Sequence, residues 1–429
     1  MADARDIACD ILDVVLTDGA PMDRALASHG GLANLDPRDR AQARRIVATV
    51  LRRLGEIDAV LRTLLDRPLQ KRHGRIRNVL RIGIAELLFL ETPAHAAVDA
   101  GVRVAARYRR GALKGLVNAI LRRADRERDR RPEAGPESNT PNWLFSRWVD
   151  AYGAETAGRI AQSHLIEPPL DITLARQDEA ERWAARLAAE ALPGGTLRRA
   201  GGRVAELEGF DDGAWWIQDA AAALPVRLLG EIAGKNVIDL CAAPGGKTLQ
   251  LAAAGANVTA VDVADARIGS LQENLARTGL DAEIVCADAI AWRPERPADA
   301  VLLDAPCTAT GTIRRHPDIP HRRRPGDIEK ARTLQARLLA AALDMVRPGG
   351  VVVYAVCSLE PEEGPDQIST ILDGDASVRL DPLDPGEWPE LADTSPPAVT
   401  PDGMLRTLPC HWPERGGMDG FFAARLVRS

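Results

Sequence analysis

Two of the six cysteines follow short apolar segments and stand beside polar residues. Cys307 closes the sequence DAPC after the apolar segment 300–303, and Cys357 follows the apolar segment 351–356. Because parallel strands end at one edge of a sheet, two such cysteines are expected to lie close together. A thiolate is a strong nucleophile, and a neighbouring thiol can move a proton. The spacing therefore predicts covalent catalysis by a pair of thiols.

The other cysteines have no such surroundings. No two cysteines are separated by only two residues, so neither a disulfide framework nor a zinc site is predicted, and we expect no metal. Cys9, Cys286 and Cys410 are expected to be small buried side chains. Cys241 is expected to line a cofactor loop without taking part in the chemistry.

That loop, DLCAAPGGKT (239–248), connects a predicted strand to a predicted helix. Adjacent glycines at such a turn let a ligand approach the backbone. A phosphate-binding P-loop would need a glycine at the position of Cys241. The dinucleotide-binding pattern needs glycines separated by one residue, whereas Gly245 and Gly246 are adjacent. Both of these ligand classes are therefore excluded.

Acidic residues end the next two predicted strands. Asp262 stands 17 residues beyond Gly245, where a carboxylate can accept hydrogen bonds from both ribose hydroxyls. Asp288, in the sequence VCADA, is placed to meet the edge of an adenine. Together they predict a nucleoside pocket without a pyrophosphate clamp, which favours S-adenosylmethionine as the cofactor.

Asp304, at the end of the fourth predicted strand, adds a carboxyl group to the two thiols. Cytosine C5 is a poor nucleophile until a thiolate adds to C6, after which C5 can attack a methyl sulfonium. A base then removes the C5 proton and the thiolate leaves. This chemistry needs a thiolate, an acid near N3 and a base. Cys357, Asp304 and Cys307 can supply these three groups.

The elements that hold these residues fall into four stretches. Residues 1–124 have apolar residues at helical spacing and predict an all-α domain, with breaks at Pro37, Pro68 and Pro93. Residues 125–141, rich in charge, Pro, Gly and Ser, predict an exposed linker. Residues 142–207 predict a small α/β region for substrate binding. The expected elements there are a helix over 143–153, a strand within 169–176 and a helix over 179–191.

Residues 208–429 alternate short apolar strands with helices, which predicts a Rossmann-like, doubly wound α/β domain. The expected strands cover 236–240, 257–261, 282–285, 300–303 and 351–356. The fold class is therefore multidomain, with an all-α part followed by a small α/β region and a parallel α/β catalytic domain.

Charge is divided unevenly along the chain. Residues 1–131 carry 26 Lys and Arg against 17 Asp and Glu, whereas the remainder carries 29 against 44. A basic first part predicts contact with a polyanion such as RNA, and a merely solvated helical surface is the alternative. A second basic run, RRHPDIPHRRR (314–324), follows DAPC and is expected to place Arg314, Arg315 and His316 at RNA phosphates.

Several motifs resemble one family, and they span nearly the whole chain. The chain resembles the RsmB (Fmu/Sun) family of rRNA cytosine-C5 methyltransferases, and its first part is similar to the NusB fold. The catalytic part carries this resemblance in WWIQDAAA (215–222), CAAPGGKT (241–248), DAPC (304–307), RRHPDI (314–319), YAVCSLEPEE (354–363) and GFFAARL (420–426). The NusB-like part carries it in PAHAAVDAGVRVA (93–105) and KGLVNAILRR (114–123).

This resemblance implies a class I S-adenosylmethionine-dependent enzyme that forms 5-methylcytosine in RNA, with 16S rRNA as the favoured substrate. It implies that Cys357 is the nucleophile and that Cys307 assists product release or proton removal. Lys247 and Asp304 are implied to lie near the target base. The implied cofactor contacts are Cys241, Ala242, Ala243, Pro244, Gly245, Gly246, Lys247, Asp262, Asp288 and Asp304.

The chain departs from the family's pattern at two places. The family usually has Ser-Gly where this chain has Thr308-Ala309, and usually Thr where it has Val356. Thr308 keeps a hydroxyl and Ala309 stays small, so we expect altered loop packing and retained activity.

Two alternatives stay open: the same chemistry on tRNA or DNA, and a non-catalytic NusB-like RNA-binding or ribosome assembly factor. The complete set of site residues speaks against the second, and the absence of a large recognition insert speaks against DNA. The charged N-terminal sequence and the lack of about 18 consecutive apolar residues predict neither a signal peptide nor a membrane span. A cytoplasmic, monomeric enzyme is expected.

Overall fold

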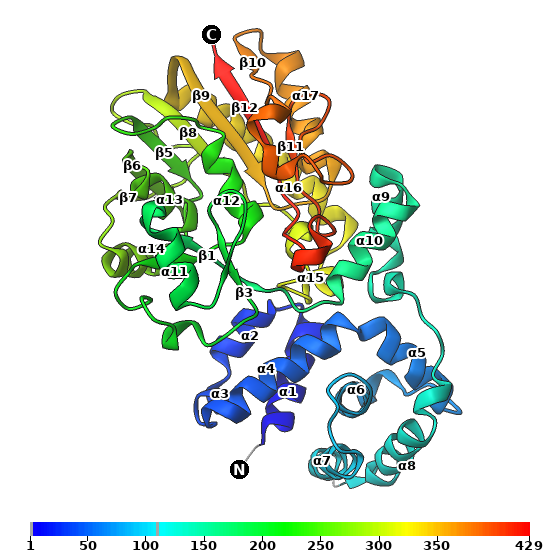
Figure 1. Ribbon diagram of the computed structural model, residues 1–429. Helices are drawn as coiled ribbons and strands as arrows, with labels where there is room; N and C mark the ends of the chain where they lie inside the picture. Colours follow the sequence, from blue (N-terminus) through cyan, green and yellow to red (C-terminus); the bar gives the residue numbers. More distant parts are fainter. Residues whose placement is uncertain (1–2, 109–110) are drawn as a thin grey trace. The chain divides into compact units, whose positions relative to one another are not determined.

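The computed structural model describes residues 3–108 and 111–429, and the chain forms two compact units. The helical unit comprises Met1–Leu165 and Ile313–Arg323, and the catalytic unit comprises Ile166–Thr312 and Arg324–Ser429 (Figure 1). The helical unit therefore includes a short segment that is distant in sequence from the rest of it.

Amphipathic helices build the helical unit. Apolar residues three or four apart, such as Ile7 and Ile11 or Ile46 and Val50, are buried in one core. Asp36 caps the fourth helix by accepting a hydrogen bond from the amide of Asp39 at 2.9 Å. The helices are α1 (Ala4–Asp13), α2 (Met22–Ser28), α3 (Gly30–Ala33), α4 (Pro37–Arg52), α5 (Leu54–Leu64), α6 (Gly74–Leu88), α7 (Ala94–Arg107), α8 (Lys114–Arg126), α9 (Asn142–Tyr152), α10 (Ala154–His164) and α15 (Ile319–Arg322).

The stretch expected to be an exposed linker is packed at its end. Asn139 is buried, and its side chain accepts from the amide of Glu56 at 3.1 Å and donates to the Glu56 carboxylate at 2.8 Å. A Cβ at Gly55 would lie 1.8 Å from the carbonyl oxygen of Ser138, so the chain approaches α5 closely there. The helices α9 and α10 also belong to the helical unit and not to a separate middle region.

A mixed sheet of eight strands forms the core of the catalytic unit. Along the sheet the order is β10-β12-β9-β8-β5-β6-β7, and β11 pairs with β12. The strands β5 to β9 are parallel, whereas β12 runs antiparallel to β9 and β10. The bounds are β5 (Asn236–Leu240), β6 (Asn257–Asp262), β7 (Glu283–Cys286), β8 (Ala298–Asp304), β9 (Val346–Val356), β10 (Val378–Leu380), β11 (Leu405–Arg406) and β12 (Phe422–Arg428).

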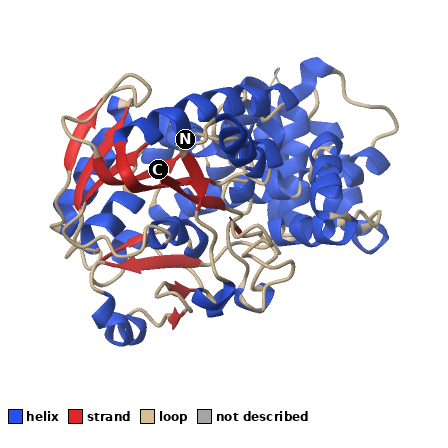
Figure 2. Cartoon of the chain, turned by 90° about the horizontal axis from the view of Figure 1, so that it is seen from above, coloured by secondary structure: helices blue, strands red, loops and turns tan. Residues whose placement is uncertain are grey.

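Helices cover both faces of this sheet (Figure 2). Along β8, Val301 and Leu303 pack in one core with residues of α16, while Ala300 and Leu302 pack in another with residues of α12. This alternation is the two-residue period of a strand that is buried on both sides. The helices are α12 (Ala220–Arg227), α13 (Gly246–Ala253), α14 (Asp265–Thr278), α16 (Pro325–Met345) and α17 (Pro365–Gly374).

The strand order fixes where a ligand can bind. β5 lies between β6 and β8, and the chain reaches β8 only after completing β6 and β7 on the other side. Such a reversal of direction opens a crevice at the carboxyl ends of the strands. The doubly wound α/β fold expected from the sequence is confirmed.

A smaller antiparallel sheet precedes the large one in the sequence, with the order β2-β3-β1-β4. Arg198 and Asp171 form a buried bidentate ion pair beneath it, with both nitrogen–oxygen distances at 2.7 Å. Its elements are β1 (Leu170–Leu174), α11 (Ala180–Arg186), β2 (Glu190–Ala191), β3 (Leu197–Arg199) and β4 (Trp215–Ile217). Among the described residues, no helix is long and apolar enough to cross a membrane.

Candidate active site

The loop between β5 and α13 has the conformation that its small residues permit. Cys241 directly follows β5 with φ +62°, and Gly245 caps α13 with φ +111°. A Cβ at Gly245 would lie 2.6 Å from Leu271 Cδ1, so a larger residue would be excluded by space as well as by conformation. The loop therefore leaves its backbone open at the carboxyl edge of the sheet.

Asp262, at the end of β6, is almost fully buried and holds this loop in place. Its carboxylate accepts hydrogen bonds from the amides of Ala243 at 3.1 Å and Ala264 at 2.9 Å, and from Arg267 at 2.9 Å. By contrast, Asp288 after β7 is exposed, and one of its oxygens accepts from the amide of Ile290 at 2.9 Å. The two carboxylates predicted to contact a nucleoside thus end neighbouring strands.

Asp239, inside β5, is a further carboxylate at this edge to which the sequence assigned no role. It is fully buried and accepts a hydrogen bond from Thr248 Oγ1 at 2.6 Å. Burial raises the pKa of Asp239 to about 7, and the carboxylates of Asp304 and Asp262 add to this rise. In the sequence, only its position two residues before Cys241 indicates that Asp239 lies near the cofactor loop.

Lys247 and Asp304 form an ion pair beside the thiols. Lys247 Nζ lies 2.8 Å from Asp304 Oδ2 and 5.0 Å from the centre of the Phe421 ring. Burial disfavours the charge of this lysine and by itself would lower its pKa. Asp304 and other nearby negative groups outweigh burial, so the pKa of Lys247 is raised. The pair fixes the direction of the Asp304 carboxylate, whose side chain remains 32% exposed.

The two cysteines lie where the strand ends place them. Cys307 Sγ is 3.4 Å from Cys357 Sγ, at the carboxyl ends of the neighbouring strands β8 and β9. The pKa of Cys307 is raised well above its ordinary value by the hydrogen bond with Cys357, by burial and by nearby negative charges. At neutral pH Cys307 is therefore a protonated thiol that faces the second sulfur.

The loop after Cys307 holds Ala309, one of the residues at which the chain departs from the family's usual pattern. Ala309 has φ +61°, a left-handed conformation that costs an L-residue about 1 kcal/mol and that glycine adopts freely. The next turn leaves no room either, because a Cβ at Gly311 would lie 1.9 Å from the carbonyl oxygen of Gly420. Ala309 is therefore tolerated in a strained position.

The basic run after this loop is not a uniformly exposed surface. Arg314 is only 1% exposed, and its carbonyl accepts a hydrogen bond from Arg52 at 3.0 Å within the helical unit. A buried guanidinium cannot reach a phosphate, so its expected RNA contact is not supported. Arg315 and His316 are half-buried, and His316 pairs with Asp23 at 3.1 Å. Charge composition alone could not reveal these partners in the helical unit.

The donor set at the sheet edge suits a cationic nucleoside more than a phosphate ester. Carboxylates end or follow three strands and a fourth lies within β5, and the basic side chains beside them, Lys247 and Arg267, are each bonded to one of these carboxylates. An excess of carboxylates favours an amine and a sulfonium and repels a pyrophosphate. Among the described residues, no group of three or more His, Cys, Asp or Glu could hold a metal ion.

Comparisons with known proteins agree along the whole chain. A family model described as 16S rRNA methyltransferase RsmB/F matches residues 226–427, and the NusB family model matches residues 2–126. Ribosomal RNA small subunit methyltransferase B of Erwinia tasmaniensis is 33% identical, with 100% of this chain and 99% of that protein covered. The protein of the same name from Xanthomonas campestris is 36% identical, with 89% of this chain and 90% of that protein covered.

Solved structures agree on the fold. The crystal structure of PH0851 covers 100% of this chain and 99% of its own, with a TM-score of 0.75 and 22% identity. A methyltransferase homolog protein from Pyrococcus horikoshii covers 67% of this chain and 96% of its own, with a TM-score of 0.54 and 27% identity. The full-length relatives and the two family models show that the chain belongs to the RsmB/F family of S-adenosylmethionine-dependent 16S rRNA methyltransferases, with a NusB-family domain preceding the catalytic domain.

Proposed function

We propose that this protein transfers a methyl group to C5 of a cytosine in small-subunit ribosomal RNA, with Cys357 as the covalent nucleophile. The observation that carries the proposal is the 3.4 Å approach of Cys307 and Cys357 beside the Lys247–Asp304 pair. Membership of the methyltransferase family and the name of the full-length relatives support the substrate class.

In the proposed reaction the thiolate of Cys357 adds to C6 of the cytosine, and the new bond between sulfur and C6 moves an electron pair toward C5. N3 takes up a proton from water as C6 is attacked, and the Asp304 carboxylate, held in direction by Lys247, polarises the ring by accepting a hydrogen bond from the protonated N3. When bound at the carboxyl edge of the sheet, S-adenosylmethionine would supply the methyl group that C5 takes up, and S-adenosylhomocysteine would remain. The C5 proton then passes to a base, the bond between sulfur and C6 breaks, and the Cys357 thiolate is regenerated.

Cys307 is suited to act as that base because of what raises its pKa. The largest cause is the hydrogen bond with Cys357. That bond weakens once the sulfur of Cys357 is bonded to C6, so the pKa of Cys307 falls, its thiol proton passes to water, and the thiolate that remains accepts the proton of C5. Before the addition, the same thiol stays protonated and does not compete as a nucleophile.

The direct test is methyl transfer to unmodified RNA. Full-length protein is incubated with methyl-labelled S-adenosylmethionine and with small-subunit rRNA, tRNA or DNA prepared without modification. We expect label in the rRNA alone, at one cytosine that then resists conversion in bisulfite sequencing. Label in tRNA or DNA alone would contradict the substrate class. RNA binding without any transfer would indicate an assembly factor instead.

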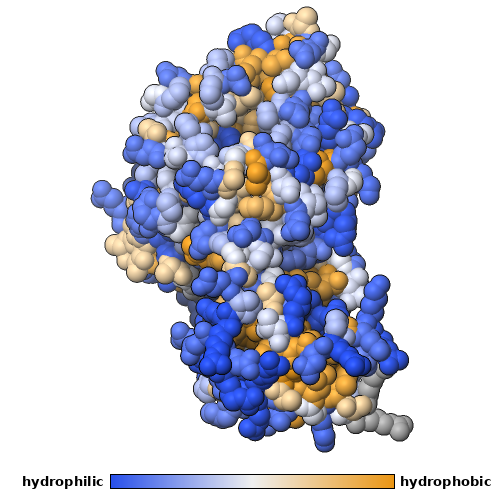
Figure 3. Space-filling model, turned by 90° about the vertical axis from the view of Figure 1, so that its right-hand side faces the viewer, coloured by the Kyte–Doolittle hydropathy of each residue, from blue (hydrophilic) through white to orange (hydrophobic). Residues whose placement is uncertain are grey.

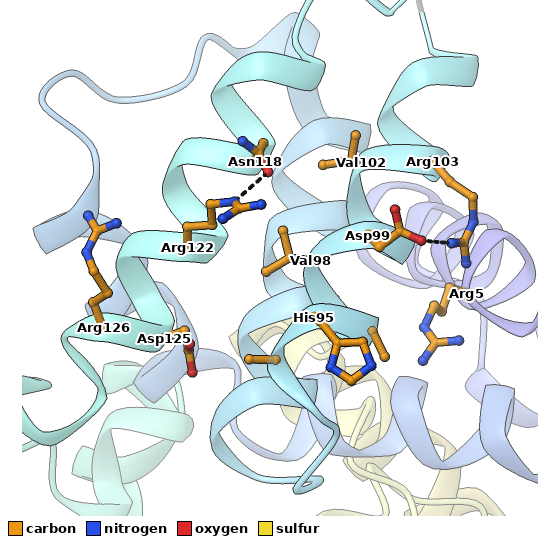
Figure 4. A pocket seen from close by; sticks show the side chains of 12 residues that line it. Arg5, His95, Val98, Asp99, Val102, Arg103, Asn118, Arg122, Asp125 and Arg126 are labelled. Carbon is orange, nitrogen blue, oxygen red and sulfur yellow. Dashed lines mark hydrogen bonds and ion pairs between the residues drawn. The ribbon is translucent and has the colours of Figure 1, made fainter.

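Docking of the RNA is assigned to a groove between α7 and α8 of the helical unit. The groove has a volume of about 830 Å³ (Figure 4). Val98 and Val102 lie between Arg122 and Arg126 on one side and Arg103 on the other. On the face turned to the viewer in Figure 3, apolar groups of the helical unit likewise gather between hydrophilic side chains.

Charge complementarity favours RNA as the occupant. Asp99 in the lining is bonded to Arg103, and Asp125 is bonded to Arg128 at 2.6 Å, so both carboxylates are neutralised. Arg122 and Arg126 are exposed, four residues apart on α8, a spacing that puts them on one face. Arginines along a groove can neutralise successive phosphates, and an apolar floor can contact riboses and bases.

Removing the two α8 charges is expected to weaken RNA binding and to make the affinity depend less on salt concentration. Full-length Arg122→Gln/Arg126→Gln should lower the slope of log affinity against log salt by about one unit for each lost phosphate contact, without changing cofactor affinity. The matched control is Arg38→Gln/Arg45→Gln, which removes two exposed arginines from α4 of the same unit. An unchanged slope in the α8 variant, or a loss confined to the α4 variant, would move the docking surface elsewhere.

A further inference from the structure

Glu363 is a fully buried carboxylate that the proposed chemistry does not use. It lies in a short helical turn, Pro361–Glu363, that follows β9 in the catalytic unit. One carboxylate oxygen accepts from the amide of Thr308 at 2.9 Å and from Gln335 Nε2 at 2.9 Å. The other accepts from Ser358 Oγ at 2.7 Å and from Thr308 Oγ1. Four donors thus converge on one buried charge.

These donors flank both cysteines. Thr308 follows Cys307 directly, and Ser358 follows Cys357 directly. Gln335, on α16, also donates to the carbonyl oxygen of Pro306 at 2.9 Å, so the chain is held on both sides of Cys307. The hydroxyls of Thr308 and Ser358 lie 3.1 Å apart. A single carboxylate therefore connects the two loops that carry the thiols.

We propose that Glu363 is a positioning residue that holds the two cysteine loops at the separation that methyl transfer and product release require. It acts through Thr308 and Ser358 and does not touch the RNA or the cofactor. The inference rests on the proposed function, because it assigns a role within the same site.

The sheet alone does not fix this separation. The ladder between β8 and β9 ends at the pair Asp304 and Ala355, so both cysteines lie beyond it. Between the loops, the amide of Gly311 donates to the carbonyl of Cys357 at 3.0 Å, and Thr310 Oγ1 accepts from the amide of Leu359 at 2.9 Å. Next to the cysteines themselves, the bonds of Thr308 and Ser358 converge on Glu363. A buried carboxylate that loses its donors is left with unsatisfied oxygens, so it resists displacement of either loop.

The negative charge has a second effect on Cys307. After the hydrogen bond with Cys357 and burial, the charge of Glu363 is among the causes that raise the pKa of this thiol. Loss of the charge is therefore expected to lower the pKa of Cys307. The rate of product release should then begin to rise at a lower pH.

The test is Glu363→Gln in the full-length enzyme. Glutamine keeps the size, and the Tyr354 hydroxyl still donates to the backbone carbonyl of residue 363, but an amide nitrogen now faces hydrogen-bond donors. We expect kcat to fall at least about 10-fold, KM for S-adenosylmethionine to stay unchanged, and the acidic limb of the kcat profile to shift to lower pH. If Glu363 had only a structural role, the substitution would lower the melting temperature and leave the acidic limb of the kcat profile at the same pH.

Substitutions at Thr308 test the same connection from the other side. Thr308→Val keeps the shape and removes the hydroxyl that bonds to Glu363, so it should lower kcat. Thr308→Ser keeps the hydroxyl and should restore most of the activity. In the double variant with Glu363→Gln, the two losses should not add, because both act through one link.

Glu390→Gln is the control for loss of stability. It removes the partner of Arg227 in the same unit, at a distance in sequence from both loops. We expect a lower melting temperature with an unchanged kcat and pH profile. The inference is overturned if folded Glu363→Gln matches the wild type in kcat and in pH profile. Inactivity of the wild-type enzyme itself would instead contradict the proposed function.

Discussion

Cys357→Ala is expected to lose both methyl transfer and covalent capture of RNA, whereas Cys307→Ala loses turnover but accumulates a covalent complex. Without the sulfur of Cys357 nothing adds to C6, so the reaction does not begin. Cys307 faces that sulfur at 3.4 Å and is a protonated thiol in the resting site. Its loss leaves the addition intact and removes the group that accepts the proton afterwards.

The complex can be measured by denaturing electrophoresis of protein with labelled RNA. The bond between sulfur and C6 is not a disulfide, so a reductant should not release it. RNA that carries 5-fluorocytosine should trap the wild-type enzyme in the same way, because fluorine at C5 cannot leave as a proton. A complex that survives in Cys357→Ala and disappears in Cys307→Ala would exchange the two roles.

Asp304→Ala is expected to lower kcat by about 10²- to 10⁴-fold, the range of a lost acid–base group. The carboxylate lies at the end of β8 and is directed by Lys247, so it can reach the ring nitrogen of a cytosine that is attacked at C6. Single-turnover rates with saturating RNA separate this loss from weaker binding. The 5-fluorocytosine complex should form more slowly by a similar factor, because ring polarisation precedes the addition.

Asp299→Ala is the matched control, because Asp299 lies near the opposite end of the same strand. Its carboxylate pairs with Arg347 at 2.8 Å and accepts from the amide of Asn236 at 2.9 Å, so its loss also removes hydrogen bonds. We expect a small change in stability and an unchanged kcat. Equal losses of kcat in both variants would mean that Asp304 acts on the sheet and not on the base.

The parallel strands could be predicted because each is marked by residues within the strand itself or next to it in the sequence. The segment 236–240 is apolar, bounded by turn residues and followed by glycines, and it forms β5 with these bounds. The strand β12 carries no comparable signal of its place. It lies antiparallel between β9 and β10, and that position depends on pairing with residues about 70 and about 50 positions earlier. Spacing along the chain therefore predicts elements more readily than their order in the sheet.

The candidate site likewise has features that the sequence predicts and features that only the fold reveals. Strand ends suffice to predict that Cys307 and Cys357 meet, because parallel strands share an edge. Strand ends do not distinguish Glu363 from its neighbour Glu362, since both stand in one polar run. Only the fold buries Glu363 among donors from α16 and the Cys307 loop. The run of arginines after residue 313 was misleading for a related reason. Its histidines, His316 and His321, bond to Asp23 and to the carbonyl of Leu51, which are remote in sequence.

The segment Ile313–Arg323 also sets the order in which this protein can be completed during synthesis. His321 bonds to the carbonyl of Leu51, and Asp318 accepts from the amide of Met22, so these residues fill a place within the helical unit. The ribosome makes them only after the first half of the catalytic sheet. At about 5–20 residues per second, the nascent helices wait about 8 to 30 s between residue 165 and residue 323. The helical unit is thus finished only when the cofactor loop already exists.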